Sequence, residues 1–152
     1  MRTRSMKVID MAVHEVATIT ADQTICQCAQ RMRLDHVGSL VVVDDNQTPL
    51  GMITDRDIAI EVVAKNLNPT ALTVKDVMTA PVVTASPDES MVVALARMRE
   101  FGVRRLPIVD EAGKLAGVIS NSNLVEELSA LLDSLVRNIH SSKTREVALR
   151  SE

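Results

Sequence analysis

Residues 39–57 read SLVVVDDNQTPLGMITDRD, and residues 105–123 read RLPIVDEAGKLAGVISNSN, 66 positions further along the chain. The correspondence extends without a gap over residues 8–58 and 74–124, where 14 of 51 aligned positions are identical. A repeated segment of this length indicates one supersecondary unit used twice, with the apolar faces of the halves buried together. Any pocket between the halves is therefore expected as a pseudo-symmetric pair.

Each half predicts the order strand, helix, strand, strand, helix. Short β-branched runs predict strands at 16–19, 39–43 and 50–53, and at 82–84, 106–109 and 116–119. Capping boxes are expected to start the first helix of each half, with Thr20 and Gln23 in one and Ser86 and Glu89 in the other. Apolar residues at helical spacing follow both boxes.

The last helix of each half is expected to begin near Thr54 and Ser120. The second of these helices carries an apolar stripe from Leu124 to about Ile139, and the polar segment 140–152 is expected to fray.

Composition excludes several classes of protein. The chain has 152 residues, 46% of them hydrophobic, which is enough for a packed core and too much for disorder. A net charge of −3 and a single aromatic residue, Phe101, disfavour nucleic acid as a partner. No segment is apolar enough for a signal peptide or a membrane span, so no membrane partner and a cytoplasmic location are expected. Cys26 and Cys28 are two apart on an expected helix and point to different faces, which disfavours a disulfide, and no metal-ligand spacing joins them to the histidines.

Several motifs at constant spacing resemble the CBS (cystathionine-β-synthase) domain. They are 77–79 (VMT), 103–110 (VRRLPIVD) and 117–120 (GVIS) in the second half, and 51–57 (GMITDRD) in the first. The resemblance covers about residues 8–125 and suggests a stand-alone Bateman module. It implies an α/β fold of two pseudo-symmetric β-α-β-β-α CBS repeats packed through their sheets, with a C-terminal helical tail. The expected boundaries are 1–66, 67–126 and 127–152.

The family resemblance further implies a homodimer and two clefts between the repeats. In many members these clefts bind an adenosine-containing ligand, such as AMP, ADP, ATP or S-adenosylmethionine. The family's ribose-binding Thr/Ser-x-x-Asp pattern matches Thr54 and Asp57, where a carboxylate at a helix start could accept both ribose hydroxyls. The same pattern is close to a capping box, which needs no ligand, and both interpretations remain open.

The second copy of the pattern is Ser120 and Asn123, which lacks the carboxylate. The cleft containing Asp57 is therefore predicted to bind more tightly than the cleft containing Asn123. Arg104 and Arg105 are the best candidates to hold a phosphate, or else are solvated surface residues. Candidate walls of the nucleotide site, which could equally be plain core positions, lie at 16–18 and 82–84, with 37–40 and 103–106 behind them. They include Thr18, Val37, Ser39 and Val82.

The sequence favours a regulatory role over catalysis. It offers no nucleophile with a paired base, no metal cluster and no phosphate-binding glycine loop, so no enzyme activity and no required cofactor are expected. The leading hypothesis is a sensor that binds an adenosyl ligand and signals to a protein partner. The alternative is a ligand-independent dimerisation or interaction module, in which Leu128, Leu131, Leu135 and Ile139 contact a partner.

Overall fold

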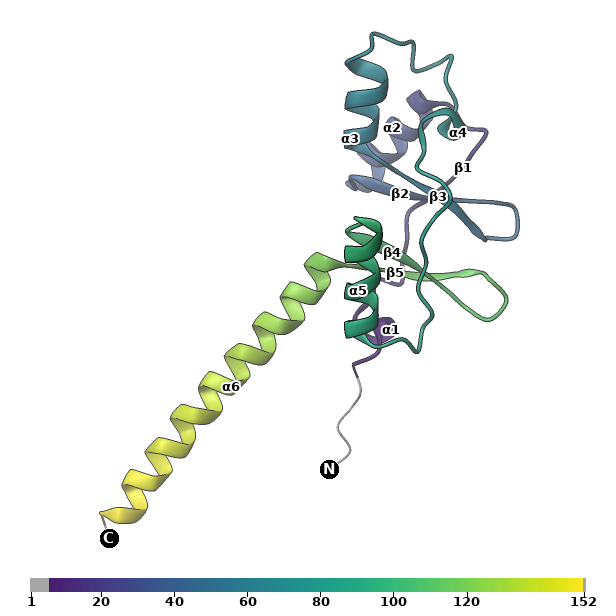
Figure 1. The fold of residues 1–152 in the computed structure, drawn as a ribbon. Helices are drawn as coiled ribbons and strands as arrows, with labels where there is room; N and C mark the ends of the chain where they lie inside the picture. The colour runs from purple at the N-terminus through teal and green to yellow at the C-terminus, as the bar shows by residue number, and fades with distance from the viewer. Residues whose placement is uncertain (1–5, 152) are drawn as a thin grey trace.

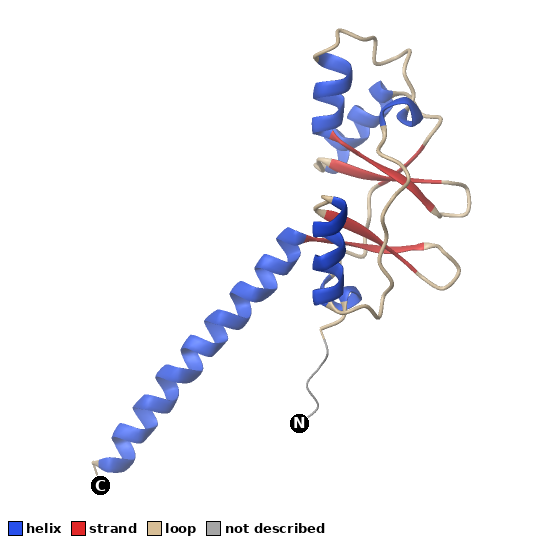
Figure 2. Cartoon of the chain, viewed as in Figure 1, coloured by secondary structure: helices blue, strands red, loops and turns tan. Residues whose placement is uncertain are grey.

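The structure is a computed structural model that describes residues 6–151 (Figure 1). A short helix, α1 (Val8–Met11), precedes the first repeat. The first repeat contains β1 (Thr18–Thr20), α2 (Ile25–Asp35), β2 (Ser39–Val43), β3 (Pro49–Thr54), α3 (Asp55–Ile58) and a π-helical continuation, η1 (Ala59–Val63). A second short helix, α4 (Val74–Val77), precedes the second repeat, which contains α5 (Met91–Phe101), β4 (Arg105–Val109), β5 (Leu115–Ser120) and α6 (Asn121–Arg150). The predicted α/β class, with two repeats and a C-terminal helix, is confirmed (Figure 2).

Each repeat is built on an antiparallel hairpin with the same register. Strand β2 pairs with β3, and β4 pairs with β5; both ladders shift register by one residue, between Val42 and Val43 in one and between Ile108 and Val109 in the other. The two hairpins lie side by side (Figure 1). Their turns are joined because the Leu115 N–H donates to the Gln47 carbonyl oxygen at 2.9 Å.

The repeats differ in their first strand. In the first repeat β1 pairs in parallel with β2, from Thr18 opposite Val41 to Thr20 opposite Val43. In the second repeat only a bridge between Ala85 and Ile108 remains. The strand predicted at 82–84 is therefore wrong: the segment contacts the sheet one residue later and too briefly to form a ladder.

The two repeats exchange the segments that precede them. Val8 of α1 is fully buried in the second core, with Leu106, Ile108 and Ile119. Val74 of α4 is fully buried in the first core. Backbone bridges between Lys7 and Ser90, and between Thr24 and Thr73, hold these segments in place. Each core therefore contains a residue from the segment that precedes the other repeat.

The helix starts predicted at Thr20 and Ser86 are wrong by four residues. Helix α2 begins after Thr24, whose side chain and that of Gln27 form the capping box, and α5 begins after Ser90. The exchanged segment explains the first case, because the N–H groups of Ile25 and Cys26 donate to carbonyl oxygens of Leu72 and Pro69. These bonds satisfy helix-terminal donors that the sequence assigns to local residues.

Helix α6 extends much further than predicted. It runs to Arg150, so the segment 140–150 is helical rather than frayed. After Leu124, which is buried, the helix leaves the two repeats and projects away from them (Figure 1). No helix within residues 6–151 is both long and apolar enough to cross a bilayer.

Candidate functional site

The hairpin register places a polar residue beside the start of the helix that follows each hairpin. Ser39 lies opposite Thr54 at the end of the β2–β3 ladder. Arg105 lies opposite Ser120 at the end of the β4–β5 ladder. The two motifs predicted to form the site are thus in equivalent positions, with a small hydroxyl beside one and a cation beside the other.

Thr54 and Asp57 form a capping box at the start of α3. The Asp57 N–H donates to Thr54 Oγ1 at 3.1 Å, and the Thr54 N–H donates to Asp57 Oδ2 at 2.9 Å. The capping interpretation is therefore correct, but the cap occupies only some of the hydrogen-bonding groups of the two side chains. Among the hydrogen bonds of the described residues, Asp57 Oδ1 has no donor and the Thr54 hydroxyl proton has no acceptor. Both groups are half-buried and available to a ligand.

Ser120 and Asn123 form the equivalent box at the start of α6, but the pair is closed on itself. Asn123 Oδ1 accepts from the Ser120 N–H at 3.0 Å and from the Ser120 hydroxyl at 2.7 Å. The Asn123 N–H donates back to Ser120 Oγ at 3.2 Å. What Asn123 has left to offer is its amide NH₂ group, which is a donor only. The first motif therefore offers a carboxylate acceptor and a hydroxyl donor, whereas the second offers only an amide donor.

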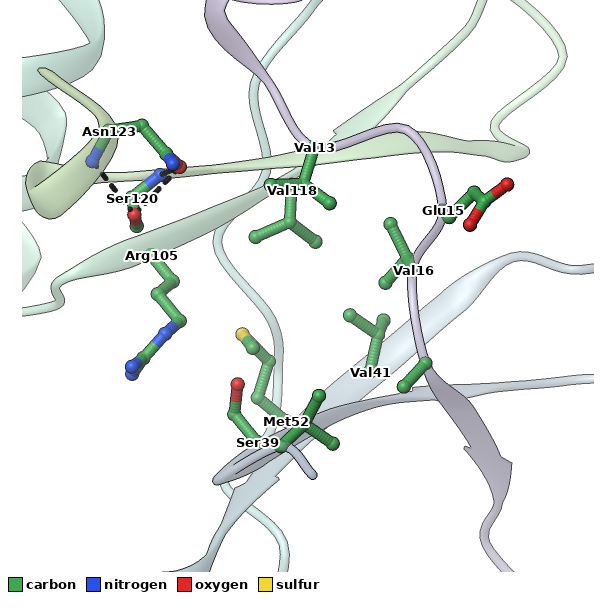
Figure 3. A pocket seen from close by; sticks show the side chains of 12 residues that line it. Val13, Glu15, Val16, Ser39, Val41, Met52, Arg105, Val118, Ser120 and Asn123 are labelled. Carbon is green, nitrogen blue, oxygen red and sulfur yellow. Dashed lines mark hydrogen bonds between the residues drawn. The ribbon is translucent and has the colours of Figure 1, made fainter. Parts of the chain in front are cut away.

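A cavity of about 190 Å³ lies between the two repeats, on the side of Ser120 and Asn123 (Figure 3). Residues of both hairpins and of the segment that links α1 to β1 form its wall. The lining is mostly apolar and consists of Val13, Glu15, Val16, Ala17, Val37, Ser39, Val41, Met52, Arg105, Val118, Ser120 and Asn123.

Most polar groups of the cavity, with the exception of Glu15, lie at one end. Ser120 and Asn123 lie there, and the side chain of Arg105 extends from β4, beside Ser120, away from them toward the first repeat (Figure 3). The ion pairs within residues 6–151 do not include Arg105, so its guanidinium is free to meet an anion. Glu15 lies at the opposite side, beside Val16 (Figure 3). The arrangement suits a molecule with one flat apolar part and one polar or anionic part.

The cavity brings together half of the residues predicted to form the site. Val37, Ser39, Arg105, Ser120 and Asn123 line it. Arg104 lies next to it, on a second, open hollow that it shares with Arg105, Asn121, Ser122, Val125 and Glu126. Neither hollow includes Thr54, Asp57, Thr18 or Val82. The free carboxylate of Asp57 therefore lies outside the cavity.

The sequence indicated residues 16–18 as a candidate wall, and Val16 and Ala17 line the cavity, but it did not indicate Val13 or Glu15. Val13 bridges to Val118 of β5. An equivalent bridge joins Thr79 to Met52 of β3, at the same offset of 66 residues. The repeat could have revealed this wall, because Thr79 belongs to a recognised motif and Val13 occupies the same place in the other half. Within residues 6–151, no group of three or more His, Cys, Asp or Glu side chains could hold a metal ion.

Two copies of one α/β unit, with exchanged N-terminal segments and a cavity between them, define a tandem-repeat module. The model of the CBS domain matches this chain twice, over residues 8–64 and 74–130. The chain therefore belongs to the CBS domain family, as a tandem pair.

Three similar proteins illustrate the relationship. Protein MK0525 of Methanopyrus kandleri is 37% identical over 123 residues, which are 81% of this chain and 63% of that protein, so the chain spans less than two thirds of it. The CBS domain-containing protein YhcV of Bacillus subtilis is 34% identical over 138 residues, 86% of this chain and 96% of YhcV. The CBS domain pair of protein MJ0100 has the same fold, with a TM-score of 0.73 and 23% identity, covering 82% of this chain and 97% of that one.

Proposed function

We propose that the protein is a non-enzymatic regulatory module that binds an adenosine-containing ligand between its two repeats. The observation that carries the proposal is the cavity built from both repeats, with valine walls and a polar end at Ser120, Asn123 and Arg105. The MJ0100 domain pair, which shares the fold, was solved in complex with 5′-methylthioadenosine and S-adenosyl-L-methionine. Adenosyl compounds are therefore the first ligands to test.

The chemistry of the cavity suggests how such a ligand would lie. A purine ring needs an apolar slot, which the side chains of Val16, Val37 and Val41 provide. A phosphate or carboxylate on the ligand would meet Arg105, which can form two parallel hydrogen bonds to either group. The Asn123 amide would donate to an oxygen or ring nitrogen between them.

The size of the cavity implies that binding changes the protein. Pockets that enclose a drug-sized ligand measure roughly 300–1,000 Å³, whereas this cavity measures about 190 Å³. A nucleotide held entirely between the repeats, rather than partly in the open hollow beside Arg104, would have to move the repeats apart or displace the segment 13–17. A ligand that binds the opened arrangement better shifts the protein toward it, and that shift is the signal a partner could read.

Thr54 and Asp57 are proposed as a second, unequal site on the other side of the module. The free Asp57 Oδ1 is an acceptor for ribose hydroxyls, and the charge makes each bond stronger than one to Asn123. The two sides would therefore differ in selectivity: the Asp57 side suits a diol, and the Asn123 side suits a ligand that offers acceptors and an anion.

Isothermal titration calorimetry of the full chain tests the proposal, using AMP, ADP, ATP, S-adenosylmethionine and 5′-methylthioadenosine. Val41→Phe fills the cavity, and Arg105→Gln removes its cation. Asp57→Asn removes the carboxylate of the second proposed site but keeps an amide oxygen that can cap α3, as Asn123 caps α6.

We expect micromolar binding of at least one compound, weakened by Val41→Phe. Thermal unfolding of each variant without ligand controls for folding. Absence of heat and of thermal stabilisation across the panel would overturn the proposal and favour the ligand-independent assembly module.

A further inference from the structure

Helix α6 carries an apolar face that no other part of the described chain covers. The face consists of Val125, Leu128, Leu131, Leu132, Leu135, Val136 and Ile139, whose exposed fractions lie between 44% and 64%. Five of them, Val125, Leu128, Leu132, Leu135 and Ile139, are spaced alternately three and four residues apart, the repeat of a coiled coil. The helix projects away from both repeats, so neither repeat covers this face (Figure 1).

A helix of this kind is not expected to stand alone in water. It spans 30 residues, or about 45 Å, and residues 125–150 of the helix are all exposed. Most of the stability of helices in proteins comes from packing an apolar face, and isolated helices are marginal. A contiguous exposed stripe of leucine, isoleucine and valine is therefore the mark of a contact surface.

The charges on α6 identify the partner as a second copy of the same helix in antiparallel orientation. Residues 121–135 carry three acidic side chains and no base: Glu126, Glu127 and Asp133. Residues 136–150 carry four bases and one acid: Arg137, Lys143, Arg145, Arg150 and Glu146. Asp133 and Arg137 already pair within the helix, at 3.0 Å. The remaining charges form an acidic end and a basic end. Parallel pairing would place like charges together, whereas antiparallel pairing places each acidic end beside a basic end.

We propose that α6 mediates self-association of this protein through an antiparallel helix pair centred between Leu132 and Leu135. In that register Leu132 packs on Leu135 of the second copy, and Leu128 packs on Ile139 of the second copy. Both contacts occur twice by the twofold symmetry of an isologous interface, which gives four consecutive apolar layers. Leu131 and Val136 flank these layers and widen the buried surface. The proposal is independent of ligand binding between the repeats.

Sedimentation equilibrium of the full chain measures the association. The double variant Leu132→Asp/Leu135→Asp places carboxylates in the central layers, and we expect it to halve the mass of the assembly and raise its dissociation constant by more than about a hundredfold. Val147→Asp is the matched control, because Val147 is 66% exposed and lies off the proposed seam. An unchanged mass in the double variant would overturn the proposal, even if the repeats associate through another surface.

Charge reversal tests the partner and the orientation together. Glu126→Lys/Glu127→Lys makes both ends of α6 basic, and Lys143→Glu/Arg145→Glu makes both ends acidic. Each variant alone is expected to associate at least about tenfold more weakly than the parent, and an equimolar mixture is expected to associate as a heterodimer. A mixture no tighter than its components would overturn the antiparallel pair. The proposal would also be overturned if the apolar face of α6 bound only a different protein.

Spin-label distances give a second test of orientation, in a Cys26→Ser/Cys28→Ala background. In the antiparallel pair, labels at Ser134→Cys lie nearly opposite each other, whereas labels at Thr144→Cys are separated by roughly 30 Å along the axis. Equal short distances at both positions would show a parallel pair and overturn the proposal.

Discussion

Gly51 lies so close to the carbonyl oxygen of Thr79 that a Cβ atom at position 51 would be 2.6 Å from that oxygen. Gly117 faces the carbonyl oxygen of Val13 in the same way, with a distance of 3.0 Å. Both contacts belong to the backbone bridges that hold a linking segment against a hairpin, Met52 to Thr79 and Val13 to Val118. The paired glycines of the two repeats thus mark where one repeat's leading segment crosses the other repeat's sheet.

Gly51→Ala is predicted to destabilise the protein by about 2 kcal/mol, because backbone atoms must shift to remove the overlap. Gly117→Ala is predicted to lower the free energy of unfolding by less, since its nearest atom is further away. Urea unfolding followed by circular dichroism measures both values. Equal effects, or a more stable Gly51→Ala variant, would show that the crossing segment adapts without strain.

A second prediction follows from the exchange of the segments that contain α1 and α4. Val8→Ala removes two methyl groups from the second core, where Val8 is fully buried. At about 0.8 kcal/mol per carbon and a further term for the cavity, the expected loss of stability is about 2 kcal/mol. Hydrogen exchange should show the earliest loss of protection in β4 and β5, although Val8 precedes the first repeat in sequence.

Val74→Ala is the matched control, since Val74 is fully buried in the first core. It should affect β2 and β3 first. If Val8→Ala instead exposed β2 before β4, the segment would belong to the first repeat in solution.

Local patterns predicted the elements whose contacts are local. The strand predicted at 39–43 is correct to the residue, and the helix starts at Thr54 and Ser120 are correct because each cap is satisfied within three residues. The start of α2 was wrong because distant carbonyl oxygens of Pro69 and Leu72 take the N–H groups that decide it. No local pattern reports a partner more than forty residues away.

The residues of the candidate site were likewise predicted where they belong to a local motif and missed where tertiary packing places them. The repeat and the family motif indicated Ser120 and Asn123, and register placed Arg105 beside them. The cavity wall at Val13 and Glu15 comes from the segment between α1 and β1, whose position depends on the exchange between repeats. Motifs therefore indicated the polar end of the cavity, and tertiary packing determined which side of the molecule is hollow.

The buried thiol of Cys28 predicts a loss of stability in alkali. Burial raises the pKa of Cys28 to about 11, from a usual value of 9.0. The unfolded chain therefore ionises first, and the free energy of unfolding should fall as pH rises from about 9 to about 11, by up to about 1.4 kcal/mol per pH unit. Well below pH 9 the thiol is protonated in both states and contributes no pH dependence.

Urea unfolding between pH 8 and pH 10.5 tests this prediction, with Cys28→Ala as the comparison. The equivalent residue of the second repeat is Ala94, also fully buried, so alanine suits this position. The chain has no tyrosine to titrate in the same range. The difference between parent and variant should shrink as pH rises; a constant difference would show that the thiol stays accessible to solvent.

Asn123→Asp is predicted to strengthen binding of a ribose-bearing ligand on the cavity side. Aspartate can keep the cap, as Asp57 does with one oxygen at 2.9 Å from the Thr54 N–H, while its second oxygen becomes an acceptor for ribose hydroxyls. Replacing a neutral hydrogen bond by a charge-assisted one contributes about 1.5 kcal/mol, so affinity for adenosine should rise about tenfold. Calorimetry measures the change.

Asn121→Asp adds the same charge at the start of the same helix but outside the cavity, where it lines the open hollow with Arg104. Equal gains in both variants would mean that charge near the helix start acts at a distance, and that Asn123 does not touch the sugar.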